Sequence, residues 1–142
     1  MTTDLLVSLD RVLPASPEKV FEALTDPEKY SRWMGPEGSK VTVEKMDVVL
    51  GGELRFTVTL PDSGMTFELY GYYEEVDPPN RLVHSWATVG DEEVSTVAFE
   101  LEPHGDDTRL HIRHHGLTKP EDVAQNEAGW AHQLDRLEKL LT

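Results

Sequence analysis

Three histidines lie close together near the end of the sequence, at His111, His114 and His115, and they are the side chains that most directly suggest chemistry. Imidazole is a common zinc ligand and an acid–base group near neutral pH. On a β-strand, however, His111 and His115 share one face about 13 Å apart, and His114 faces the other way. One zinc ion needs its ligands about 2.1 Å away. This triplet alone therefore does not predict a metal site.

The sequence contains none of the common motifs of nucleophilic or phosphate chemistry. It has no Gly-x-Ser-x-Gly elbow, no phosphate loop, no dinucleotide fingerprint and no cysteine. His84, His114 and Glu127 are candidate acid–base groups, but no pattern places a nucleophile beside a base. We therefore predict no catalytic residues and no cofactor.

His114 is the histidine with the clearest structural context. It shares a strand face with Leu110 and Ile112, so we expect it to point toward the inside of the fold. It either forms hydrogen bonds to the backbone or water at the edge of the core, or it orients a bound ligand as one of few polar groups.

A long amphipathic helix is predicted from about Thr118 to Leu141. Thr118 and Glu121 have the spacing of a capping box, and Pro120 suits the first helical turn. Apolar side chains recur at the spacing of one helical face: Val123, Trp130, Leu134, Leu137 and Leu141. About six turns of helix need an apolar partner surface, so we expect this helix to pack on a sheet.

Most of the preceding chain alternates polar and apolar residues as half-buried strands do. The first strand is predicted at Asp4–Leu13, and Ser16–Pro17 and Asp26–Pro27 each mark the start of a short helix. Six further strands follow, separated by turns. We predict an α+β fold in one domain over residues 1–142: a curved antiparallel sheet of six to seven strands wrapped on the long C-terminal helix, with two short helices after the first strand.

Large aromatic residues are expected on the inner face of this sheet and on the helices. They fill a core, or they line an apolar cavity, because a strongly bent sheet and a helix are hard to fill edge to edge. The candidate ligand-binding residues are Trp33, Phe56, Phe67, Trp86, His114, Trp130 and Leu134. Tyr70 and Tyr72 fall on the opposite face and are expected at the surface or in a partner contact.

The composition is strongly acidic, with 27 Asp and Glu against 13 Lys and Arg and a net charge of −14. This charge repels phosphate backbones, so we expect no nucleic-acid partner. The sequence has no apolar run of the roughly 18 residues that a membrane span needs and no signal segment, so we expect a cytoplasmic protein with no membrane partner. We expect a monomer or a weak homodimer.

An ordered set of short motifs covers nearly the whole chain. They are Ser16–Pro17 with Val20 and Phe21, Trp33 with Gly35–Pro36, Gly51–Gly52, Gly71 with Val76, Pro78, Arg81 and Leu82, Thr108 with Leu110, Gly116–Leu117, and Gly129–Trp130 with Leu134 and Leu137. This set resembles the SRPBCC superfamily of START-like, helix-grip proteins. Within it, the sequence is most similar to the family named for the activator of heat-shock protein 90 ATPase.

This resemblance implies the helix-grip fold, hydrophobic ligand binding and a link to the stress response, but one fold hosts many functions. Our first interpretation is a binding module for a hydrophobic small molecule that is aromatic, polyketide-like or lipid-like. The second is a partner protein of a chaperone ATPase. The third is an enzyme of the cyclase or aromatase type, which would use His84, His114 or Glu127.

Overall fold

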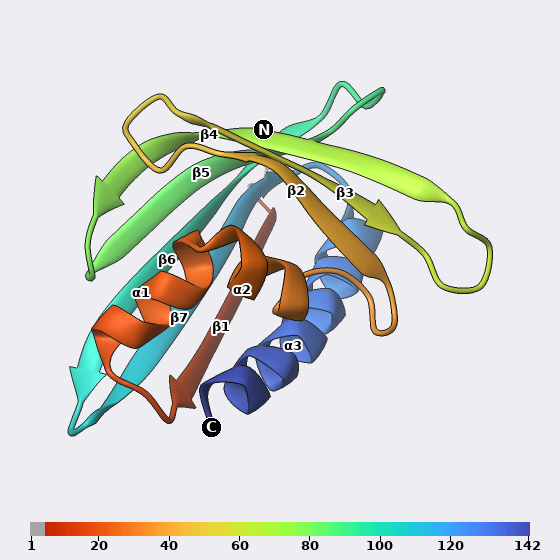
Figure 1. Cartoon of the computed structure of the whole chain (residues 1–142). Helices are drawn as coiled ribbons and strands as arrows, with labels where there is room; N and C mark the ends of the chain where they lie inside the picture. Colours follow the sequence, from red (N-terminus) through yellow and green to blue (C-terminus); the bar gives the residue numbers. More distant parts are fainter. Residues whose placement is uncertain (1–4) are drawn as a thin grey trace.

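The computed structural model describes residues 5–142, in which a seven-stranded antiparallel sheet curves around one long helix (Figure 1). The strands are β1 (Leu5–Leu13), β2 (Lys40–Met46), β3 (Glu53–Thr59), β4 (Thr66–Asp77), β5 (Arg81–Thr88), β6 (Val94–His104) and β7 (Asp107–Leu117). The helices are α1 (Pro17–Thr25), α2 (Pro27–Trp33) and α3 (Pro120–Leu141). The predicted α+β helix-grip fold is confirmed, while the predicted strand start at Asp4 lies outside the described residues.

The sheet order is β1-β7-β6-β5-β4-β3-β2, so the first two strands of the chain form its two edges. The short helices α1 and α2 connect these edges and cover the open side of the curved sheet (Figure 1). Both helices begin as predicted. Ser16 Oγ accepts a hydrogen bond from the Lys19 amide, and Asp26 Oδ1 accepts one from the Glu28 amide at 2.9 Å.

The curvature of the sheet is visible at Gly71 in β4. A Cβ atom at this position would lie 1.9 Å from the Ser85 carbonyl oxygen, so only glycine permits the strands to approach this closely. The register between β4 and β5 shifts between Tyr73 and Glu75, which indicates a β-bulge just beyond this glycine. Gly71 is therefore a point of close backbone approach between β4 and β5.

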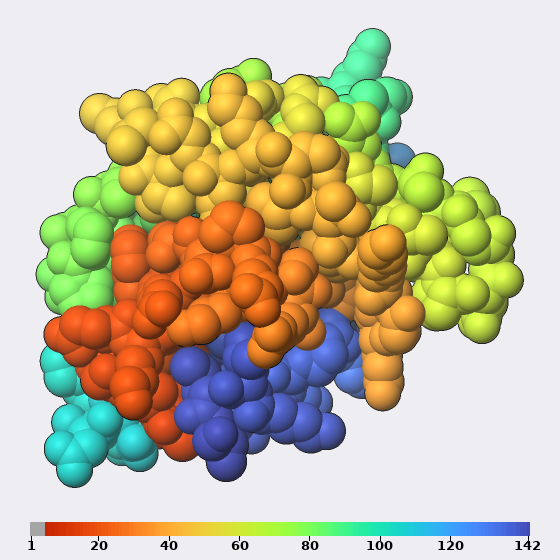
Figure 2. Space-filling view, viewed as in Figure 1, coloured from red at the N-terminus to blue at the C-terminus, as the bar shows by residue number. Residues whose placement is uncertain are grey.

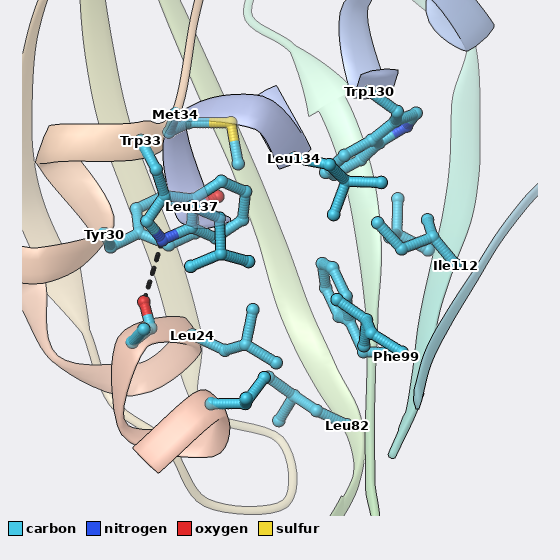
Figure 3. Close-up of a cluster of buried hydrophobic side chains, with 14 of the residues drawn as sticks. Leu24, Tyr30, Trp33, Met34, Leu82, Phe99, Ile112, Trp130, Leu134 and Leu137 are labelled. Atoms are coloured by element: carbon cyan, nitrogen blue, oxygen red, sulfur yellow. Dashed lines mark hydrogen bonds between the residues drawn. The ribbon is translucent and has the colours of Figure 1, made fainter. Parts of the chain in front are cut away.

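Helix α3 lies across the concave face of the sheet and buries Trp130, Leu134 and Leu137 (Figure 1). The C-terminal half of the helix packs in a filled core with α1, α2 and the sheet (Figure 3). Trp33 is fully buried there, and its indole N–H donates to the Ala23 carbonyl at 2.9 Å. This hydrogen bond satisfies the one polar group of the ring inside the core.

The start of α3 differs from the prediction. Lys119, not Thr118, is the N-cap residue, and it makes no side-chain capping bond, so the predicted capping box of Thr118 and Glu121 is wrong. Proline disfavours helical geometry in the residue before it, and Lys119 is accordingly extended, with φ −121° and ψ 132°. The helix therefore begins one residue later, at Pro120, and the Thr118 hydroxyl instead donates to Glu93 Oε1.

Candidate functional site

A pocket of about 730 Å³ lies between the N-terminal half of α3 and the concave face of the sheet. This volume is in the range of small-molecule sites, about 300–1,000 Å³. The interior of the fold thus has two parts: a filled core under the C-terminal half of α3, and an open pocket under its N-terminal half. The sequence left a filled core and a cavity as alternatives, and the structure contains both.

Aromatic rings from three strands and α3 form the apolar wall of the pocket. The ring centroids of Trp86 and Trp130 lie 5.7 Å apart, and those of Trp86 and Phe56 are also separated by 5.7 Å. Trp130 and Phe56 are 2% and 1% exposed, whereas Phe67 is 39% exposed. The inner rings therefore form a preorganised apolar floor, and Phe67 stands at the mouth of the pocket.

The loop between α2 and β2 forms another part of the pocket wall, and two side chains of α3 hold it in place. The Gly35 amide donates to Gln133 Oε1 at 2.7 Å. The Arg136 guanidinium donates to the carbonyls of Trp33 and Gly35, which are the last carbonyls of α2 and its C-terminal extension. This loop and the β3–β4 hairpin project beside one another, while α1, α2 and the end of α3 close the front of the molecule (Figure 2).

The main polar group in the pocket is His114, which is 1% exposed and held by a chain of hydrogen bonds. The Trp130 indole N–H donates to His114 Nδ1 at 3.2 Å. Because an indole N–H can only donate, Nδ1 must be the unprotonated nitrogen and Nε2 carries the hydrogen. Nε2 then donates to Ser95 Oγ at 2.6 Å, and the Ser95 hydroxyl donates to the Trp86 carbonyl at 3.3 Å. Both ring nitrogens of a neutral imidazole are thereby satisfied.

Burial also favours the neutral form of His114. Removal from water, together with the neighbouring His84 and His115, lowers its pKa to about 4. His84 lies in the core beside Trp86, where burial lowers its pKa to about 4 despite the hydrogen bond to the Ser85 carbonyl. Both imidazoles are therefore uncharged at pH 7.

The contact between Ser95 and His114 resembles a nucleophile–base pair, but its hydrogen positions are reversed. A general base must accept the serine proton, whereas Nε2 of His114 already carries a hydrogen and donates it. Glu127, the third candidate acid–base group, is exposed and does not line the pocket. In this arrangement the polar chain orients Trp130 and His114, and it does not activate Ser95.

Five of the seven predicted site residues line the pocket together: Phe56, Phe67, Trp86, His114 and Trp130. Trp33 and Leu134 lie instead in the filled core. Sequence reasoning did not select Ser95 or Gln133, because nothing in the local pattern marks a serine that faces a histidine on the adjacent strand. Gly129, a residue type that is unfavourable inside a helix, lies in the pocket wall.

Gly129 faces open space. A Cβ atom built at this position would meet no heavy atom of residues 5–142 within 4 Å, so none of the described strands packs closely against it. Tight backbone packing therefore does not explain this glycine. The glycine instead leaves the pocket wider beside Trp130 than any other residue would.

Outside the pocket, the other histidines of β7 face away from it. His111 lies on the outer face between Asp10 and Glu102. Within residues 5–142, no three His, Asp or Glu side chains are arranged to hold a metal ion. None of the helices described here is long and apolar enough to cross a membrane.

Comparison with known proteins places this arrangement in a family. The family model described as Activator of Hsp90 ATPase homolog 1-like protein matches residues 14–142. The crystal structure of protein CV1439 from Chromobacterium violaceum has a TM-score of 0.91 and 27% sequence identity, over 96% of each chain. That of protein NE0264 from Nitrosomonas europaea has a TM-score of 0.82 and 26% identity, over 96% of this chain and 94% of the other. No curated protein matched the chain.

Proposed function

The chain belongs to the Activator of Hsp90 ATPase homolog 1-like family, and from this premise we propose that it is a binding protein for a hydrophobic small molecule. The ligand would occupy the pocket between the sheet and α3 and would be aromatic, polyketide-like or lipid-like. The observation that carries this proposal is the 730 Å³ pocket lined by Phe56, Trp86 and Trp130. We propose Phe56, Phe67, Trp86, His114 and Trp130 as the residues that contact the ligand.

The floor of the pocket supports binding rather than catalysis. The His114 nitrogen that faces Ser95 is Nε2, which carries a hydrogen and cannot accept the serine proton. The hydrogen bonds to Ser95 and Trp130 fix the imidazole ring in one orientation. Ligand binding to a preformed apolar site of this kind costs little side-chain conformational entropy, because the rings are already packed against one another. The polar chain would then give orientation, and the aromatic rings would give affinity.

The test uses N-phenyl-1-naphthylamine, an uncharged apolar probe whose emission rises in apolar surroundings. We expect it to bind, to quench tryptophan emission and to raise the melting temperature. At a probe concentration one hundredfold above Kd, binding should stabilise the fold by about 2.7 kcal/mol. If the probe and a broad library of apolar compounds produce neither quenching nor a thermal shift, the proposal is wrong.

A matched pair of variants locates the binding site. Phe67→Arg places a charge at the mouth of the pocket and should abolish binding. Tyr72→Arg is the control, because Tyr72 is on the same strand, is 48% exposed compared with 39% for Phe67, and does not line the pocket. Equal loss of binding in both variants would show that the probe binds outside the pocket.

The family match supports a second candidate, a partner of a chaperone ATPase. Co-purification of the chain with the heat-shock ATPase would test it. Retention of the ATPase by Phe67→Arg, together with loss of the probe, would show that the two activities use different surfaces.

A further inference from the structure

The charges around the pocket are all of one sign. Among residues 5–142, four carboxylate side chains line it, those of Glu37, Asp91, Glu93 and Asp122, and no lysine or arginine does. Glu37, Asp91 and Glu93 are exposed, so these charges lie where the pocket opens to solvent. A pocket for a fatty acid or another carboxylate would require the opposite sign at this position.

None of these carboxylates forms a salt bridge among residues 5–142, and only Glu37 lies near a cationic group, the Arg136 guanidinium. Other acidic side chains are paired, for example Glu75 and Glu100 with Arg81. By contrast, Asp91 accepts only the Glu93 amide, at 3.0 Å, and Glu93 accepts only the Thr118 hydroxyl, at 2.5 Å. Within this part of the chain, the charges of Asp91, Glu93 and Asp122 therefore have no ion-pair partner, and only that of Glu37 is partly offset, by the Arg136 guanidinium.

The positive end of the α3 dipole does not reverse this balance. It amounts to about half an elementary charge. Glu121 and Asp122 in the first turn already face that end, and Arg136 is occupied by the carbonyls of Trp33 and Gly35. The net charge of −14 adds a field of the same sign as the pocket carboxylates.

The interior of the pocket is also suited to a cation and unsuited to an anion. Trp86 and Trp130 line it, and the π-face of an indole attracts ammonium groups and not anions. His114 is neutral, and both its nitrogens are occupied by Trp130 and Ser95. The only other histidine of the lining among the described residues is His132, on the exposed side of α3, and the lining offers no lysine or arginine to an anionic ligand.

From these observations we infer that the natural ligand is a cationic amphiphile, an amine with an apolar body. The body lies on the aromatic floor, and the ammonium group lies among the carboxylates at the mouth. This inference rests on the proposed function and names the chemical class of its ligand.

The experiment measures displacement of N-phenyl-1-naphthylamine by three compounds that share one body: 4-phenylbutylamine, 4-phenylbutanol and 4-phenylbutyrate at pH 7.5. Only a compound that replaces the probe in the pocket changes the signal, so amine bound elsewhere on the acidic surface is not counted. The amine should bind at least about tenfold more tightly than the carboxylate, with the alcohol between them. The advantage of the amine should shrink when salt is raised to about 1 M, where the Debye length is about 3 Å.

The variant Asp91→Asn/Glu93→Gln removes two charges at the mouth and retains oxygen acceptors for the Glu93 amide and the Thr118 hydroxyl. It should reduce the difference in affinity between the amine and the carboxylate, and it should leave the affinity for the alcohol unchanged. The control is Glu74→Gln/Asp106→Asn, which removes two exposed charges that do not line the pocket. The control should preserve the preference for the amine.

Three results would overturn the inference while the proposed function stands: equal displacement by all three compounds, tightest binding of the carboxylate, or an equal effect of both double variants. The last result would mean that the preference for the amine comes from the overall negative charge of the protein and not from the carboxylates at the mouth of the pocket. If the apolar probe itself does not bind, the proposed function fails and the inference fails with it.

Discussion

Substitutions at Gly129 provide a sharp test of the pocket, because this residue is both a helix residue and part of the pocket wall. Glycine inside a helix is less favourable than alanine by about 1 kcal/mol. A Cβ atom at Gly129 meets no heavy atom within 4 Å, so alanine gains this difference without a clash. Gly129→Ala should therefore stabilise the protein by about 1 kcal/mol and raise the melting temperature by about 3–4 °C.

A larger side chain at the same position should weaken probe binding without unfolding the protein. Gly129→Trp directs an indole into the pocket, so it should keep the fold and weaken N-phenyl-1-naphthylamine binding at least about tenfold, or about 1.4 kcal/mol. Ala128→Trp is the matched control, since Ala128 is the exposed neighbour and does not line the pocket. Urea unfolding and probe titration of the four proteins give both quantities.

Two results would refute this reasoning. A loss of stability in Gly129→Ala would mean that another part of the chain packs against the glycine. Unchanged probe binding in Gly129→Trp would mean that the probe occupies another site.

Burial lowers the pKa values of His84 and His114 to about 4, whereas histidines in the unfolded state titrate near 6.5. As the pH falls from 7.5 to 5, the unfolded state therefore binds protons that the folded state does not bind. The free energy of unfolding should fall by about 2 kcal/mol for each of the two histidines. Urea unfolding at both pH values should show a smaller loss in His114→Gln, and an identical loss would contradict burial as the cause. Trp130→Ala should destabilise the fold by about 3 kcal/mol, since the ring is buried and donates to His114, and a loss below about 1 kcal/mol would contradict that burial. The acidic chain should not retain DNA or RNA in a gel shift at about 0.15 M salt, and a persistent shifted band would refute this.

Much of the fold could be predicted because each element carries its own periodicity. Alternation within the strands places Phe56, Trp86 and His114 on the inner face, and the spacing of Trp130, Leu134 and Leu137 places them on the buried face of α3. These are local properties, and the structure preserves them. Gly71 was likewise predictable, since a glycine inside a strand commonly permits a close backbone approach.

The division of the interior into a filled and an open half could not be predicted in the same way. It depends on how far α3 stands from the sheet along its length, which is set by contacts between distant segments. Trp33 and Leu134 are as apolar as the pocket residues, but α2 packs against the C-terminal half of α3 and fills the space there. Periodicity identifies an inward direction and does not show whether the space is occupied.

The hydrogen-bond chain of His114 was also hidden from the sequence. Ser95 lies on β6 and His114 on β7, and their contact depends on the register of those strands, in which Thr96 pairs with His115. A one-residue shift of register would turn Ser95 to the other face.

The most direct test of ligand binding in the pocket uses the indole N–H resonances of the three tryptophans during titration with N-phenyl-1-naphthylamine. Trp86 and Trp130 line the pocket, and Trp33 lies in the filled core, so it serves as an internal control. We expect saturable shifts of the Trp86 and Trp130 indole resonances and of the Gly129 amide resonance, with the Trp33 indole resonance unchanged. Saturable binding that leaves Trp86 and Trp130 unperturbed would contradict it.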